Sequence, residues 1–238
     1  MTVGIAGPQN GSVTRIGSCA DRVSALWQTF DSGRTRPLRW RLAQLDGLTA
    51  FLRDNERDIL DALFTDLGKP EFEGFASDVG AVILEIKTLR KNLPRQLRPR
   101  RVRTPLTSRP ARSYLYPEPL GVVLVMPAWN YPVGLAVLPA AGALAAGNAV
   151  ALKTSEVAPT TASLMMALLP NYLDRQAFDV FLGGPEVAEE LLQERYGHIH
   201  YTGNSRVGRS VMRAASATLT PVTLELGGKN PVYVHRDA

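Results

Sequence analysis

One carboxylate in this sequence stands where acid–base chemistry is feasible. Glu225 lies in the apolar run 222–226, and Gly227 and Gly228 follow the run directly. The run predicts a short strand, and a carboxylate at its end can accept a proton from a reacting group as a general base. The alternative is a structural glutamate bound to a nearby cation such as Lys229.

A second segment, Met126-Pro-Ala-Trp-Asn-Tyr-Pro132, brackets a tryptophan and an asparagine with two prolines. Because the prolines restrict the backbone, the side chain of Asn130 is held in one direction. A fixed amide donor at a strand end is what an oxyanion hole uses. The same arrangement also suits a purely structural turn.

Two further segments have features of nucleotide-binding loops. Lys153 ends the apolar run 149–153 and Glu156 follows three residues later, at a strand end where an acid can accept hydrogen bonds from ribose hydroxyls; a plain surface loop is the alternative. Residues 203–208, Gly-Asn-Ser-Arg-Val-Gly, lie between a predicted strand and a predicted helix, where free amides can face a diphosphate. The usual three-glycine dinucleotide fingerprint is absent, so the alternative is an ordinary turn capped by Ser205.

Strands and helices alternate from Gly121 onward, and this alternation predicts an α/β fold with helices on both faces of a parallel sheet. The predicted strands span residues 122–126, 149–153, 179–182, 199–202, 222–226 and 231–234. The predicted helices span residues 135–146, 160–169, 185–194 and 207–217. A Rossmann-like, doubly wound sheet of this kind binds its ligand at the carboxyl ends of the strands, which is where the segments above are located.

The first part of the chain predicts helices. Apolar residues recur at helical spacing over 39–67, with Gly68 placed to end the helix, and again over 76–93. The predicted organisation is a flexible tail (1–22), a helical section with a proline-broken basic connector (23–113), and a Rossmann-like nucleotide-binding domain (114–238). Alternation around Tyr114 predicts a short strand or hairpin arm where the last two meet.

The net charge of +5 is local in origin. Residues 87–112 hold ten Lys and Arg and no acid, so the rest of the chain sums to 5 − 10 = −5. Four prolines interrupt this stretch and no aromatic residue offers a base-stacking platform, so a solvated connector is favoured and no nucleic-acid partner is expected.

Metal and disulfide chemistry are not expected either. Cys19, in the predicted tail, is the only cysteine and is expected to be a solvent-facing thiol; no third ligand accompanies His198 and His200. The chain has neither an apolar run long enough for a membrane helix nor a signal-peptide pattern, which predicts a soluble, cytoplasmic protein.

Four of these segments together resemble the aldehyde dehydrogenase superfamily, because they occur in the family's order and at about its spacing. The resemblance runs from about Ser24 to the C-terminus, and the phrase Tyr116-Pro-Glu-Pro-Leu-Gly-Val-Val-Leu-Val125 is most similar to the class 3 branch, which acts on medium-chain, fatty and aromatic aldehydes. The segments are 127–132, 152–156, 201–208 and 225–231.

The resemblance implies NAD(P)-dependent oxidation of aldehydes to carboxylates, with a homodimer as the full-length form. Asn130 would donate to the oxyanion, and Glu225 would be the general base. Lys153 and Glu156 would hold the adenosine ribose, and the position of Glu156 near a 2′-phosphate favours NAD over NADP. The full set of implied cofactor-binding residues is Trp129, Lys153, Glu156, Gly203, Asn204, Ser205, Arg206, Val207, Gly208 and Leu226.

The resemblance also implies that the family's nucleophilic cysteine would lie a few tens of residues beyond Glu225, and the 238 residues end before that point. Nothing around Cys19 matches the cysteine's setting. Milder departures are Thr154, where the family usually has proline, and Ser205, where threonine is usual. We therefore expect these residues to lack the catalytic domain and to be inactive alone; the alternative is a non-catalytic product that only binds nucleotide or pairs with a full-length subunit.

Overall fold

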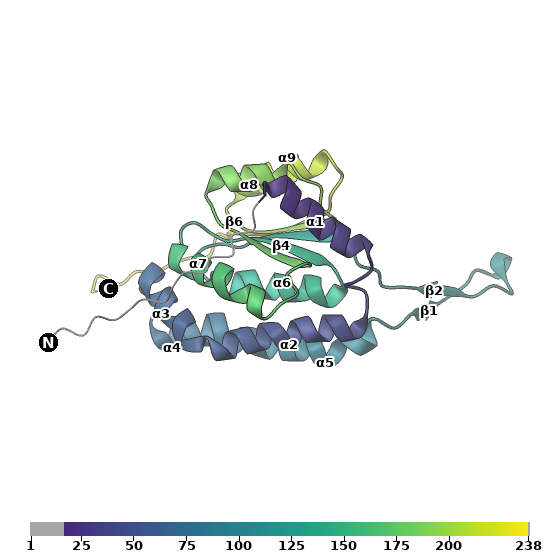
Figure 1. Ribbon diagram of the computed structural model, residues 1–238, viewed down its shortest axis with the longest axis horizontal. Helices are drawn as coiled ribbons and strands as arrows, with labels where there is room; N and C mark the ends of the chain where they lie inside the picture. The colour runs from purple at the N-terminus through teal and green to yellow at the C-terminus, as the bar shows by residue number, and fades with distance from the viewer. Residues whose placement is uncertain (1–16, 238) are drawn as a thin grey trace.

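The computed structural model describes residues 17–237, and its centre is a five-stranded parallel sheet (Figure 1). The sheet order is β5-β4-β3-β6-β7, so the chain builds outward from β3 to one edge and then returns to build the other side from β6. The point where the order reverses lies between β3 and β6, and such switch points form ligand crevices in open α/β sheets. The strands are β3 (Val122–Met126), β4 (Ala149–Lys153), β5 (Phe178–Phe181), β6 (His198–Gly203) and β7 (Val222–Leu226).

Helices cover both faces of the sheet, which is why every residue of β3 and β4 is buried. Side chains alternate along β3: Val123 and Val125 face one core, whereas Val122 and Leu124 face the other. One layer contains α6 (Gly134–Ala146), α7 (Pro159–Leu168) and the opening helices; the other contains α1 (Cys19–Asp31), α8 (Pro185–Leu192) and α9 (Ser205–Ser216) (Figure 1). The predicted α/β class and helical opening are confirmed.

The opening helices are more broken than the periodicity indicates. The predicted helix over 39–67 is two helices, α2 (Leu38–Asp54) and α3 (Glu56–Leu67), separated at Asn55. The Asn55 side chain donates to the carbonyl of Phe51 at 2.8 Å and to the hydroxyl of Tyr172 at 3.0 Å, which stabilises the break. The second predicted helix is α4 (Glu71–Gly74), a π-helical segment η1 (Phe75–Gly80) and α5 (Ala81–Gln96).

Helix α1 begins inside the predicted tail, so the boundary at residue 22 is wrong for Cys19–Arg22; residues 1–16 lie outside the described part of the chain. Ser18 and Asp21 form a reciprocal capping box at the start of the helix. Arg22 then forms a bidentate ion pair with Asp179 on β5, at 2.9 and 2.8 Å. As part of α1, Cys19 is partly buried rather than solvent-facing, and burial raises the pKa of its thiol.

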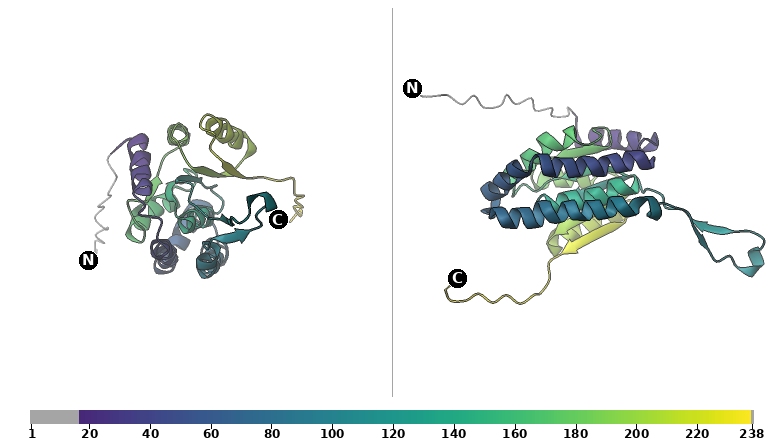
Figure 2. Two further views of the ribbon diagram at one scale, coloured as in Figure 1. Left: turned by 90° about the vertical axis from the view of Figure 1, so that its right-hand side faces the viewer. Right: turned by 90° about the horizontal axis from the view of Figure 1, so that it is seen from below.

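The basic connector forms an antiparallel hairpin of β1 (Arg100–Val102) and β2 (Ser113–Leu115), which confirms the predicted hairpin arm. The hairpin projects away from the helices and sheet in the views of Figures 1 and 2. The predicted strand over 231–234 is wrong: this stretch is extended chain whose apolar side chains, such as Tyr233 at 86% exposure, have no sheet neighbour among the described residues. Within residues 17–237, no helix is both long and apolar enough to cross a membrane.

Candidate functional site at the carboxyl edge of the sheet

The parallel sheet brings the predicted site residues to one edge. Because the strands run in the same direction, the loops after β3, β4, β6 and β7 leave the sheet on the same side. The register aligns Met126 with Tyr201, at the switch point, and Thr202 with Glu225. Segments that are up to a hundred residues apart in the chain therefore converge at this edge.

The loop after β3 presents Trp129 and Asn130 to solvent, with Trp129 51% exposed. The Asn130 side chain makes no hydrogen bond within residues 17–237, so its amide group is free to donate. The backbone carbonyl of Asn130, in contrast, accepts a hydrogen bond from Lys69 Nζ at 2.9 Å. Helix α6 begins immediately after this loop.

Lys153 and Glu156, after β4, form an ion pair with 2.8 Å between Nζ and Oε2. Lys153 is nearly buried, whereas the Glu156 side chain is 45% exposed and accessible to a ligand. Burial raises the pKa of Glu156, but hydrogen bonds from Lys153 and from its own backbone amide outweigh this effect and leave the pKa below its ordinary value. Glu156 is therefore a carboxylate at neutral pH and can accept hydrogen bonds.

The loop after β4 is held by a carboxylate from the opening helices. Asp66, on α3, accepts from the amides of Thr160 and Thr161 at 3.0 and 2.8 Å, in the first turn of α7. Burial raises the pKa of Asp66, but these bonds dominate and lower it below the ordinary value. The first turn of a helix favours negative charge, so Asp66 acts as a distant cap.

This cap predicts an acid dependence of stability. Because the pKa of Asp66 is lower in the folded than in the unfolded chain, its contribution is fully present above the unfolded pKa of about 3.9 and is lost as pH falls through the folded pKa. We expect Asp66→Asn to lose less stability than the wild-type chain between about pH 5 and about pH 2.5 in urea titrations. Asp61→Asn, an exposed position on the same helix, is the control; equal losses in the Asp66→Asn and wild-type chains would contradict the role of the cap.

The loop after β6 is closely packed. Asn204, rather than Ser205, is the N-cap of α9, and its side chain accepts from the amide of Val207 at 3.0 Å. Ser205 and Arg206 are exposed in the first turn, where helix amides lack carbonyl partners. At Gly208, an added Cβ would lie 3.1 Å from a methyl group of Leu226, so the glycine lets α9 approach β7 closely.

Glu225, on the edge strand β7, is exposed and makes no hydrogen bond or ion pair with any other residue that the structure describes. The alternative of a glutamate bound to Lys229 thus has no support in the geometry. Across the register lies Thr202, whose hydroxyl is buried without a hydrogen-bond partner. The Thr202 hydroxyl is therefore a hydrogen-bonding group of the candidate site that the described residues leave unused.

The profile described as "Aldehyde dehydrogenase family" matches residues 18–238. The chain belongs to the aldehyde dehydrogenase family. "Aldehyde dehydrogenase family 3 member A2" of Rattus norvegicus is 47% identical over 216 residues, which are 91% of this chain and 45% of the relative. "Aldehyde dehydrogenase, dimeric NADP-preferring" of Canis lupus familiaris is 44% identical over 226 residues, 94% of this chain and 49% of the relative.

Among solved structures, the substrate-bound state of Staphylococcus aureus AldH is similar with a TM-score of 0.88 at 36% identity. The match covers 91% of this chain and 47% of that structure. This aldehyde dehydrogenase chain thus resembles class 3 members and spans about half the length of the relatives it matches.

Sequence reasoning missed one loop at this edge of the sheet. Gly183, Gly184 and Pro185 link β5 to α8 at the same edge, and Gly183 has a φ of +137°, a conformation that favours glycine. Hydrogen bonds from its own amide and that of Gly184 lower the pKa of Glu186, and the charges of Lys153 and Glu156 also act on it. The Gly-Gly-Pro-Glu sequence directly after a predicted strand was a readable signal.

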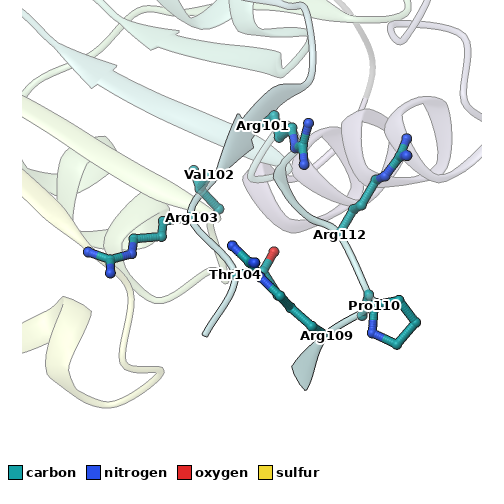
Figure 3. Close-up of a pocket in the computed structure, with 8 residues that line it drawn as sticks. Arg101, Val102, Arg103, Thr104, Arg109, Pro110 and Arg112 are labelled. Atoms are coloured by element: carbon teal, nitrogen blue, oxygen red, sulfur yellow. The ribbon is translucent and has the colours of Figure 1, made fainter. Parts of the chain in front are cut away.

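A pocket of about 600 Å³ lies in the hairpin, at the opposite end of the sheet, because β2 leads into the amino end of β3. Figure 3 shows that its lining is rich in arginine, including Arg101, Arg103, Arg109 and Arg112. None of the predicted site residues lines it. Within residues 17–237, no group of three or more His, Cys, Asp or Glu side chains is arranged to hold a metal ion.

Proposed function

We propose that this 238-residue chain binds NAD at the carboxyl edge of the sheet, as the nucleotide-binding part of an aldehyde dehydrogenase. The observation that carries this proposal is the convergence of the loops after β3, β4, β6 and β7 at the switch point of the sheet. We extend the proposal to the whole protein as oxidation of aliphatic or aromatic aldehydes to carboxylates, by a cytoplasmic homodimer. The printed name of the dog relative, "dimeric NADP-preferring", supports the dimer.

The residues present fit a nicotinamide dinucleotide. Glu156 offers a half-exposed carboxylate for ribose hydroxyls, and Lys153 beside it supplies a donor. Ser205 and Arg206 lie in the first turn of α9, where their amides have no helix carbonyl to bond and are open for a diphosphate. The buried hydroxyl of Thr202 supplies an unused hydrogen-bonding group next to Glu225.

Each side chain then has a distinct role. The bound nicotinamide supplies the hydride acceptor for aldehyde oxidation. The side-chain amide of Asn130 donates a hydrogen bond to the aldehyde oxygen, which becomes negative during attack on the carbonyl carbon. Glu225 accepts a proton from the attacking thiol or water, and its exposure leaves it accessible to such a group. The only cysteine in these residues, Cys19, lies on α1, so we propose that they bind nucleotide without turnover.

The choice between NAD and NADP depends on Glu156. A carboxylate that accepts from both ribose hydroxyls repels a 2′-phosphate, so we propose that NAD is preferred. Nucleotide titration by calorimetry tests this. Glu156→Ala is expected to weaken NAD binding about tenfold, the loss typical of a hydrogen bond to a charged group, and to leave NADP binding unchanged or stronger.

Glu118→Ala, at an exposed position near the hairpin, serves as the matched control and should bind NAD like the wild type. A folded wild-type chain that binds neither nucleotide would refute the proposed function. Aldehyde-dependent formation of NADH by the same preparation would refute the proposed lack of turnover.

A further inference from the structure

An ion pair that is nearly free of solvent contact lies directly beneath the loop after β3. Lys69 Nζ and Asp78 Oδ2 are 2.8 Å apart, and their side chains are 6% and 0% exposed. Lys69 follows the glycine that ends α3, and Asp78 lies within the π-helical segment η1. Removing two charges from water is costly, so a buried ion pair contributes little net stability by itself. Its other contacts therefore matter for its role.

Apart from a hydrogen bond that Asp78 Oδ2 accepts from the hydroxyl of Ser77 at 3.3 Å, the pair bonds to the loop after β3 and to the start of α6. Lys69 Nζ donates to the carbonyl of Asn130 at 2.9 Å and lies 4.1 Å from the centre of the Tyr131 ring. Asp78 Oδ1 accepts from the amides of Val133 and Gly134, at 3.1 and 2.9 Å, where α6 begins. The pair therefore holds the loop at its middle, residue 130, and at its junction with α6.

The loop has little else to fix it. Residues 127–130 make no backbone–backbone hydrogen bond with any other part of the described chain. The first such bond is donated by Leu135 to the carbonyl of Tyr131, already in the approach to α6. At Gly134, an added Cβ would lie 3.3 Å from the carbonyl oxygen of Ser77, so the glycine lets the start of α6 approach η1 closely. The place of residue 130 thus depends on Lys69.

We propose that Lys69 and Asp78 are positioning residues that set the direction of Trp129 and Asn130. This inference rests on the proposed function, in which Asn130 donates to the aldehyde oxygen, and on the cofactor contact of Trp129 that the family resemblance implies. The π-helical segment supports it, because such segments are rare and frequently occur at functional sites.

The test uses the full chain with Lys69→Met, Asp78→Asn and the double variant, and Lys87→Met on α5 as the exposed control. Each single variant leaves one buried charge without its partner, so its thermal midpoint falls. The double variant removes both charges, and the amide oxygen introduced by Asp78→Asn can still accept from the backbone amides of Val133 and Gly134, so the midpoint recovers. It does not restore the bond to the Asn130 carbonyl.

Two readouts separate positioning from a merely structural role. We expect NAD affinity to fall about tenfold in Lys69→Met and to stay low in the double variant, although its midpoint recovers. The indole resonance of Trp129 and the side-chain amide resonances of Asn130 should also shift in both, and not in Lys87→Met. Recovery of affinity together with the midpoint, or unmoved resonances, would overturn the proposal. A folded wild-type chain that binds no NAD would refute the proposed function alone. The resonances of Trp129 and Asn130 would then still test whether Lys69 and Asp78 position these two side chains.

Discussion

Replacing Asn148 with leucine is expected to lower the free energy of unfolding by about 3 kcal/mol, because it leaves the backbone amides of Leu120 and Gly121 without their acceptor. Asn148 is buried, and its Oδ1 accepts from the amides of Leu120 and Gly121 at 2.7 and 3.0 Å. Its Nδ2 donates to the carbonyl of Ala143 at 3.0 Å. One side chain thus joins the end of α6 to the start of β3.

Urea unfolding followed by circular dichroism measures this loss. Asn148→Asp keeps an acceptor oxygen for both amides, and where the new carboxyl is protonated its O–H can donate to the Ala143 carbonyl, so at that pH we expect it to be less destabilised than Asn148→Leu. Asn92→Leu, on α5, removes only a solvent-exposed hydrogen bond to the carbonyl of Thr88 and should stay within about 0.5 kcal/mol of the wild type. A loss below about 1 kcal/mol for Asn148→Leu would show that the hydrogen bonds are replaced after the chain relaxes.

The strands could be predicted from the sequence because the apolar pattern that marks each one lies within the strand itself. β3, β4 and β7 match the predicted ranges, since each is a short apolar run bounded by turn residues. The same criterion failed for residues 231–234, which have the alternation of a strand but no neighbour to pair with among the described residues. Composition shows that a strand is possible; pairing decides whether it forms.

Helix α1 shows the opposite failure. Its first turn, from Cys19 to Arg22, has little apolar content, which is typical of a tail. The bond that fixes it joins Arg22 to Asp179, which is 157 residues away. A contact at that separation leaves no pattern in the neighbouring sequence. The capping box of Ser18 and Asp21 is a local pattern, and it could have predicted where the helix starts.

The candidate site divides in the same way. Asn130, Glu156 and Glu225 could be predicted because each follows or ends a strand, and parallel strands bring such positions together. Lys69 and Asp78 could not, because they lie 61 and 55 residues before their partners in the loop after β3. Sequence patterns thus predict which groups gather at the carboxyl edge of the sheet, whereas the contacts that Lys69 and Asp78 make with the loop become visible only in the fold.

The packing of α9 against β7 leads to the largest expected effect on binding. Gly208→Leu places a four-carbon side chain where even a Cβ would lie 3.1 Å from Leu226 and 3.7 Å from Leu224. Helix α9 must then move away from β7, and the amides of Ser205 and Arg206 move with it. We expect NAD affinity to fall by at least about 30-fold in calorimetry, about 2 kcal/mol, and stability to fall by about 1–3 kcal/mol.

Gly142→Leu is the matched control, because an added Cβ at Gly142, in α6, meets nothing within 4 Å; it should bind NAD normally. Gly208→Ala should fall between the wild type and Gly208→Leu, since a shift of a few tenths of an ångström relieves its single close contact. A folded Gly208→Leu chain that binds within about threefold of the wild type would contradict the placement of the diphosphate at this turn. A graded loss would mean that the spacing between α9 and β7 determines nucleotide affinity, because neither substitution changes any charge at the site.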